Sequence, residues 1–162
     1  MTQQMAQMQT LDPVAIRNDA GEARWWFGAL AVIKATAADT GGQLSIVEVT
    51  EHPGAEAPLH VHHRDDEGFW ILEGEVTFEA GDQLIEASAG DYVFGPRDIP
   101  HRFTVGPDGA RMIWVLTPTG FEDFVDEVSV PAEAATVPPA HVLPPEDAAE
   151  IVLRHGMELL PG

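Results

Sequence analysis

Hydrophobic and polar residues alternate in short runs over most of the chain, and turn-forming residues separate these runs. The runs at 25–34 and 44–50 are rich in aromatic and β-branched residues, and Gly41-Gly42 lies between them, so they predict two paired strands. Seven more strand-like runs follow, at 59–62, 68–72, 75–80, 83–87, 92–94, 101–105 and 111–117. Many short strands punctuated by Gly and Pro are typical of a β-sandwich or a β-barrel.

The hydrophobic period changes after residue 117. Phe121, Phe124, Val125 and Val128 recur at helical spacing, which predicts a short amphipathic helix that closes one end of the barrel. The acidic residues of this segment, Glu122 among them, are expected on the solvent-facing side of the helix.

Three segments are expected along the chain. Residues 1–22 are polar and lack periodicity, which predicts a flexible N-terminal arm. Residues 23–130 are expected to form the barrel with its closing helix. Residues 131–162 begin with a Pro-rich connector and end with a C-terminal helix, expected at 146–153, that packs on the barrel or on a partner.

The composition excludes several classes of function. Of the 162 residues, 27 are acidic and 8 are Lys or Arg, so the formal net charge of −19 disfavours binding to nucleic acids and to anionic membranes. The chain has no cysteine, which excludes disulfides, thiolate metal ligands and a cysteine nucleophile. It shows neither a secretory signal nor a run of about 20 apolar residues, so a cytoplasmic location and no membrane span are expected.

His60, His62 and Glu67 carry the first chemical signal. Successive side chains alternate between the two faces of a strand, so His60 and His62 share one face. Glu67 begins the next strand-like run, after Asp65 and Asp66, which are expected to form a turn. A hairpin in this register places Glu67 across from the two histidines.

His101 offers a fourth ligand at the start of a later strand. Three imidazoles and one carboxylate suit one divalent transition metal (Fe, Ni, Mn, Co, Cu or Zn) and are too rich in nitrogen for a dedicated magnesium or calcium site. Four protein ligands around a six-coordinate metal leave two positions open for a substrate or for dioxygen. The other histidines lack such spacing and are expected to be structural or solvated: His52, His63, His141 and His155.

The spacing of these residues resembles the two metal-binding motifs of the cupin superfamily. The first motif is matched by Gly54, His60, His62, Glu67 and Gly74. The second is matched by Gly90, Pro96 and His101, and residues 75–89 separate the two motifs. Asp98 and Val105 depart from the family's usual Gly and Asn, but neither position is a metal ligand in the family.

Within that superfamily, the chain resembles the one-domain quercetin 2,3-dioxygenase-like cupins. The resemblance is carried by residues 67–74, 95–101, 120–122 and 155–158. It implies an all-β fold, a double-stranded β-helix or jelly-roll barrel, with a short helix after the last barrel strand and a C-terminal helical extension. It also implies a metal held by His60, His62, Glu67 and His101, with Glu67 as the catalytic base, and the opening of a flavonol or other phenolic or enolic ring by O2.

Other functions stay open at this point, because cupins also include isomerases, polyketide cyclases and non-catalytic binding proteins. Inward-facing apolar residues are expected to line the substrate pocket: Phe69, Ile71, Phe78, Phe103 and Trp114. Trp70 alternates with Phe69 and is expected on the outside of the barrel, where it suits the interface of a homodimer. The expected partners are therefore a small phenolic or flavonol-like substrate, O2 and a second copy of the chain.

Overall fold

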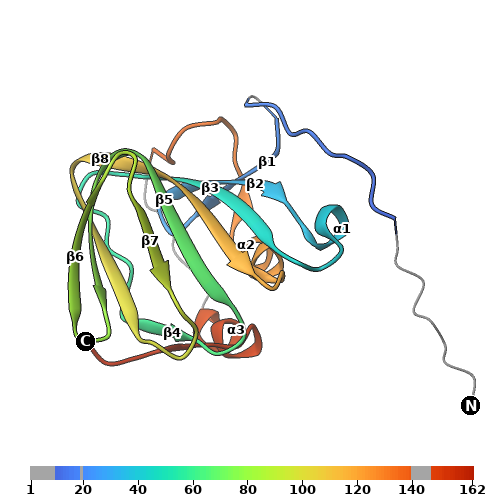
Figure 1. The fold of residues 1–162 in the computed structure, drawn as a ribbon. Coiled ribbons are helices and arrows are strands. Elements are labelled where there is room, and N and C mark those ends of the chain that lie inside the picture. Colours follow the sequence, from blue (N-terminus) through green and yellow to red (C-terminus); the bar gives the residue numbers. More distant parts are fainter. Residues whose placement is uncertain (1–9, 19, 140–146) are drawn as a thin grey trace, which may run out of the picture.

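The structure is a computed structural model that describes residues 10–18, 20–139 and 147–162 (Figure 1). Its first two strands, β1 (Glu22–Trp26) and β2 (Ala29–Ala35), form a hairpin. The sequence predicted one strand over 25–34, but Phe27 and Gly28 have φ values of 51° and 92° and reverse the chain between the two strands. The aromatic residues around this two-residue turn concealed it, because aromatic side chains favour strands.

Strand β3 contributes one face to the inside of the barrel. After the short helix α1 (Ala37–Thr40), β3 (Ser45–Glu51) pairs antiparallel with β2, so the predicted pairing of these two runs is confirmed. Side chains at every second position share one face of a strand. Ser45, Val47 and Val49 are fully buried on the inner face, and Glu51 is the last residue of that face.

Two long strands, β5 (Asp66–Ala80) and β8 (His101–Thr117), pair with each other and form the frame of the barrel. Each joins two runs that the sequence analysis separated, because the glycines expected to end the runs lie inside the strands. The register of β5 shifts at Gly74, and a Cβ atom there would collide with the carbonyl oxygen of Gly109. The two glycines therefore let the strands bend and pass close to each other.

The remaining strands complete one antiparallel sheet that curls into the barrel seen in Figure 1. β4 (His60–His62) lies between β8 and a C-terminal strand that the sequence did not predict, β10 (Met157–Leu159). β5 also pairs with β6 (Gln83–Ser88) and β7 (Tyr92–Gly95). The predicted all-β jelly roll is thus confirmed.

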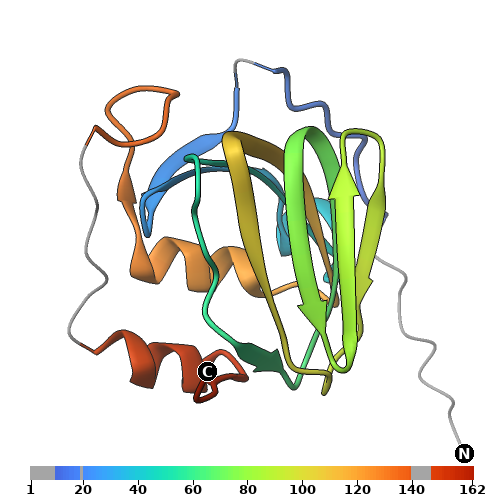
Figure 2. The same cartoon turned by 90° about the vertical axis from the view of Figure 1, so that its left-hand side faces the viewer.

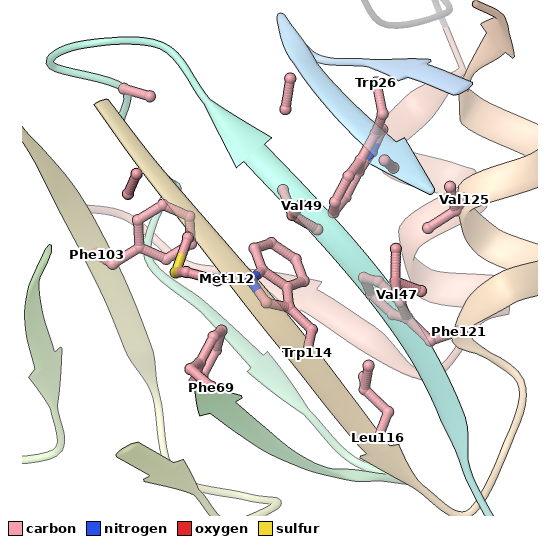
Figure 3. Packing of buried hydrophobic residues seen from close by; sticks show 14 of the residues in the cluster. Trp26, Val47, Val49, Phe69, Phe103, Met112, Trp114, Leu116, Phe121 and Val125 are labelled. Atoms are coloured by element: carbon pink, nitrogen blue, oxygen red, sulfur yellow. The ribbon is translucent and has the colours of Figure 1, made fainter. Parts of the chain in front are cut away.

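The interior of the barrel is filled by side chains from alternate positions of β3, β5 and β8 (Figure 3). Phe69, Phe103 and Trp114 meet edge to face, with ring centroids 5.5 to 6.3 Å apart. Such contacts between aromatic rings add to the stabilisation that their burial already provides. The core is therefore densest where β5 and β8 lie side by side.

Trp70 points out of the barrel, as its alternation with Phe69 predicted. It is 53% exposed, and Tyr92 and Phe94 of the neighbouring strand β7 are exposed beside it. The homodimer that this outer face suggested stays a prediction.

The predicted amphipathic helix is α2 (Phe121–Val128), and its four apolar residues are buried. Glu122 was expected in solvent, which is wrong. Its buried carboxylate accepts hydrogen bonds from the hydroxyl groups of Ser45 and Thr119 and from the backbone N–H groups of Ala37 and Gly120. Burial acts to raise the pKa of Glu122, but these hydrogen bonds outweigh burial and lower it. The ionised carboxylate therefore ties α2 to the start of β3.

The C-terminal segment folds back onto the barrel. Helix α3 (Ala148–Arg154) packs beside α2, and its Ile151 and Val152 are buried. Figure 2 shows the two helices stacked at one side of the barrel, opposite β6 and β7. Earlier in the chain, β9 (Val130–Pro131) pairs with β1, while the connector at 140–146, with His141, lies outside the described residues. No helix in the described ranges is long and apolar enough to cross a membrane.

Replacing Glu122 with Ala is expected to lower the free energy of unfolding by about 3 kcal/mol, because two hydroxyl and two backbone N–H groups lose a charged acceptor inside the protein. Urea denaturation followed by circular dichroism measures this change. The control is Asp123→Ala, which removes an exposed carboxylate from the next position of α2 and should cost less than about 1 kcal/mol. Equally small losses in both variants would show that the Glu122 network does not anchor the helix.

Candidate metal centre

Three histidines and one glutamate meet inside the barrel. Each offers one ligand atom, and the four atoms of His60, His62, Glu67 and His101 all lie within 4.8 Å of one another. His62, Glu67 and His101 are each 2% exposed, and His60 is half-buried. The structure therefore brings together all four residues that the sequence analysis singled out as ligands.

Strand pairing accounts for this convergence. His60 and His62 lie on the same face of β4, and their ring centroids are 5.2 Å apart. His60 is paired directly with His101 in the register between β4 and β8. Glu67 comes from the second residue of β5, the other long strand of the frame. Four residues from three strands thus converge because the barrel closes.

Local hydrogen bonds orient two of the imidazoles. Nδ1 of His60 lies 2.7 Å from the carbonyl oxygen of Pro58, and Nδ1 of His101 lies 3.1 Å from that of Ile99. A carbonyl oxygen only accepts hydrogen bonds, so each Nδ1 carries the proton and donates it. The Nε2 atoms of both rings are therefore the atoms available for a metal, and that of His101 lies 3.2 Å from Oε2 of Glu67.

A carboxylate orients the third imidazole in the same way. Nδ1 of His62 lies 2.7 Å from a carboxylate oxygen of Asp65. On the opposite edge of the ring, Nε2 of His62 lies 3.4 Å from Oε2 of Glu67, and Nε2 of His101 lies 3.2 Å from that oxygen. Partners of this kind fix the ring and make a metal-binding histidine more basic.

Asp65 and Asp66 were both expected in the turn before Glu67, but Asp66 is the first residue of β5, and each carboxylate has a partner. Asp65 supports His62, and the signal for this was a carboxylate three residues after a candidate ligand. Asp66 binds the Arg97 guanidinium through both of its oxygens, at 3.0 and 2.9 Å, and also accepts the backbone N–H of Arg97. This pair ties the start of β5 to the loop that precedes His101.

The charge states of the four groups suit a cation. Burial, together with the nearby His101, lowers the pKa of His60 to about 4, so its imidazole is neutral at pH 7. Burial acts to raise the pKa of Glu67, but His62 and His101 outweigh burial and lower it, which keeps the carboxylate ionised. Burial also acts to lower the pKa of His62, but Glu67 and Asp65 outweigh it and raise that pKa. The site therefore attracts positive charge, and three nitrogens with one carboxylate oxygen suit a divalent transition metal.

A cavity of about 580 Å³ adjoins this cluster, and seven Trp and Phe residues are among those that line it. Phe69, Phe103 and Trp114, which were expected to line a pocket, do line it. Ile71 and Phe78 were expected there too, but they are buried in the packed core and are not part of the cavity wall. Alternation along β5 identifies the inward positions, but it does not separate cavity wall from packed core.

Much of the wall comes from segments that the sequence analysis did not connect with the site. Trp26 of β1, Phe121 and Phe124 of α2, Val152 of α3 and Met157 of β10 all line the cavity. Residues so distant in sequence give no spacing signal that would place them together. Their only common signal is a large apolar side chain in a segment predicted to pack on the barrel.

Glu51 and His52 also line the cavity, although neither was assigned to it. Glu51 is only partly exposed and follows Val49 on the inner face of β3. Burial raises the pKa of the Glu51 carboxyl to about 7, and His52 beside it acts weakly in the opposite direction. His52 is exposed, as expected, and its Nδ1 lies 2.9 Å from the carbonyl oxygen of Pro53.

Comparison with protein families agrees with this site. Residues 47–116 match the cupin domain family. All four candidate ligands lie inside the matched segment, and the barrel has the fold that the family implies. The matched segment is thus similar to the cupin domain family, which agrees with the two motifs found in the sequence.

Individual relatives add detail. Quercetin 2,3-dioxygenase from Bacillus subtilis (strain 168) is 27% identical over 137 residues, which cover 85% of this chain and 39% of that protein. The chain thus spans about two-fifths of the length of this curated relative. A solved RmlC-like cupin from Shewanella frigidimarina NCIMB 400 is 23% identical, with a TM-score of 0.60 over 70% of this chain and 97% of that chain. A predicted oxalate decarboxylase from Thermotoga maritima is 17% identical, with a TM-score of 0.57 over 65% and 99%. The solved structures support the fold alone.

Replacing His62 with Ala is expected to abolish tight metal binding, because a ligand that Asp65 orients is removed from a buried site. Metal analysis of protein purified without a chelating tag measures this, and His101→Ala should behave in the same way. The control is His63→Ala, because His63 is exposed and its imidazole contacts Asp98 instead. Full metal content in both ligand variants would rule out this site.

Replacing Glu51 with Gln is expected to stabilise the protein at pH 8 but not at pH 4.5. The pKa of Glu51 is about 7 in the folded protein, against an ordinary value of 4.5, so wild-type stability falls as the pH rises from 4.5 through 7. The difference between variant and wild type should grow over this range by on the order of 2 kcal/mol. Urea denaturation at several pH values tests this, with Glu86→Gln as the control at an exposed position. A difference that does not change with pH would contradict the burial of an ionisable Glu51.

Proposed function

We propose that the protein is a metal-dependent cupin dioxygenase that opens a flavonol or another phenolic or enolic ring with O2. The observation that supports this most is the convergence of His60, His62, Glu67 and His101 beside a cavity with aromatic walls. The proposal assigns these four residues as the ligands of one divalent transition metal. The cavity is large enough for an aromatic ligand of drug-like size.

The likeness to the Bacillus subtilis quercetin 2,3-dioxygenase supports the reaction type. At 27% identity it does not by itself decide the substrate. The donor set supplies an independent argument, because imidazoles with one carboxylate leave room on a transition metal for a substrate and a second small molecule. The first line supports a dioxygenase reaction, and the second supports a metal that can hold a substrate and a small molecule together.

In this mechanism Glu67 is the catalytic base. A divalent transition metal held by these four side chains would polarise a substrate oxygen and exchange electrons with dioxygen. The Glu67 carboxylate is ionised and fully buried, so its Oε2 accepts the proton of the substrate hydroxyl group. The imidazoles of His62 and His101 lie beside that oxygen and hold it in position. Phe69 and Trp114 exclude water and offer flat faces to an aromatic substrate.

A second candidate function is enolisation without oxygen, as in a cupin isomerase or a polyketide cyclase. The ionised carboxylate of Glu67 favours it, because one buried base beside the candidate metal ligands can remove a proton from a substrate and return it at a neighbouring atom. The same cavity could also bind a small molecule without turning it over.

Oxygen consumption distinguishes these functions. Metal-loaded protein mixed with a flavonol should consume O2 at an oxygen electrode, and Glu67→Gln should lower the rate at least about 100-fold while keeping the size of the side chain. The matched control is Glu86→Gln, which changes an exposed residue of β6 and should keep the full rate.

Two other outcomes would contradict the dioxygenase proposal. Exchange of substrate hydrogen with solvent deuterium, without oxygen uptake, would support enolisation instead. Saturable flavonol binding without any turnover would support a binding protein.

A further inference from the structure

The cavity has a second polar end, at Glu51. We propose that Glu51 binds a hydroxyl group of the substrate there, so that the site selects an elongated aromatic molecule with oxygen atoms at both ends. This inference rests on the proposed function, because it concerns the substrate of the same cavity.

Strand registers place Glu51 far from the metal cluster. Glu67 of β5 is paired with Leu116 of β8, which is paired with Ser45 at the start of β3. Glu51 is paired with Ala110 at the other end of β3. Six strand positions separate Ser45 from Glu51, which corresponds to roughly 20 Å of backbone measured along the strand. The side chains that reach inward from both ends shorten the gap that a ligand would span. The cavity reaches both levels, because Glu51 and Glu67 both line it.

Between these two ends the wall is aromatic (Figure 3). The ring of Trp114 lies 5.5 Å from that of Phe69 and 5.4 Å from that of Trp26, centroid to centroid. Trp26 and Trp114 are more than nine-tenths buried, and their indole N–H groups have no acceptor within the described part of the chain. Buried donors of this kind are normally satisfied, so the middle of the wall also suits a ligand that carries oxygen.

Glu51 differs from Glu48 of the same strand in having no polar partner among the described residues. Glu48, on the opposite face of the strand, forms ion pairs with Lys34 and Arg111. No hydrogen bond or ion pair to the Glu51 carboxyl comes from the described residues, and the only charge that acts on it is that of His52. A partly buried carboxyl without a protein partner loses part of its hydration. A ligand hydroxyl group would restore the missing hydrogen bond.

The chemistry of this end matches phenolic hydroxyl groups. Because the pKa of Glu51 is about 7, both of its protonation states are present near neutral pH, and the carboxyl group can accept a hydrogen bond or donate one. At the other end of the same molecule, oxygen atoms would bind the metal that the His-Glu cluster holds in the proposed function. A ligand with oxygen at one end only would leave Glu51 unsatisfied and should bind more weakly.

A pair of ligands tests this assignment. Quercetin and 3-hydroxyflavone share the same 3-hydroxy-4-keto group, but only quercetin carries further hydroxyl groups on its outer rings. Their Kd values are measured by isothermal titration under anaerobic conditions with metal-loaded protein. Glu51→Leu, which keeps the side-chain volume, should raise the Kd of quercetin about 10-fold and leave that of 3-hydroxyflavone unchanged. Glu51→Gln should keep most of the wild-type preference, because an amide still forms hydrogen bonds.

The control is Glu86→Leu, the same chemical change at an exposed residue of β6, which should alter neither Kd. Thermal melting and metal content confirm that each variant is folded and loaded. Equal changes for the two ligands in Glu51→Leu, or failure of both to bind the wild-type protein, would overturn the assignment. The test is separable from that of the proposed function. If oxygen uptake is intact but Glu51→Leu does not weaken quercetin binding relative to 3-hydroxyflavone binding, only the role of Glu51 is refuted. If Glu51→Leu has that effect but no oxygen is consumed, only the dioxygenase is refuted.

Discussion

A fully buried carboxylate among three imidazoles is the interaction on which this structure depends. Removing an ionised carboxylate from water costs several kcal/mol unless positive charge or hydrogen bonds compensate for it. Glu67 obtains that compensation only where β4, β5 and β8 come together, because its Oε2 lies 3.2 Å from His101 and 3.4 Å from His62. The site is therefore complete only when the barrel closes and brings these three strands together. A divalent cation bound there would supply further positive charge beside the Glu67 carboxylate.

The groups around the cluster are organised to keep it in this geometry. Each imidazole is held at Nδ1 by a carbonyl or a carboxylate oxygen, so the rings present Nε2 to one point. The Asp66–Arg97 pair fixes the loop before His101, and Glu122 fixes α2 against β3. These supports come from short polar contacts, while the aromatic core gives the wall its shape. Polar contacts thus hold the candidate ligands in place, aromatic packing shapes the cavity, and Phe69 and Trp114 lie where the two regions adjoin.

Short-range periodicity predicted a β-sandwich or β-barrel, and the resemblance to the two cupin motifs implied the jelly roll and the full set of candidate ligands. Alternation places His60 and His62 on one face, and motif spacing supplies Glu67 and His101. The same alternation failed at Phe27-Gly28 and at Gly74, where backbone conformation rather than side-chain pattern decides whether a chain turns or bends. It also placed Ile71 and Phe78 on the inner face without showing that they lie outside the cavity wall. Asp65, Glu122 and the strand β10 were missed because their partners are known only once the chain has folded.

The origin of the cavity wall has a consequence for how such a protein could change over time. Residues 47–116, the segment matched by the cupin family, hold all four candidate ligands, whereas Trp26, Phe121 and Val152 lie outside it. Apart from β10, which pairs with the strand that carries His60 and His62, the flanking segments can therefore vary and give the chamber a different shape around the same cluster. The small molecule that such a protein binds could thus change while the four candidate metal ligands are kept.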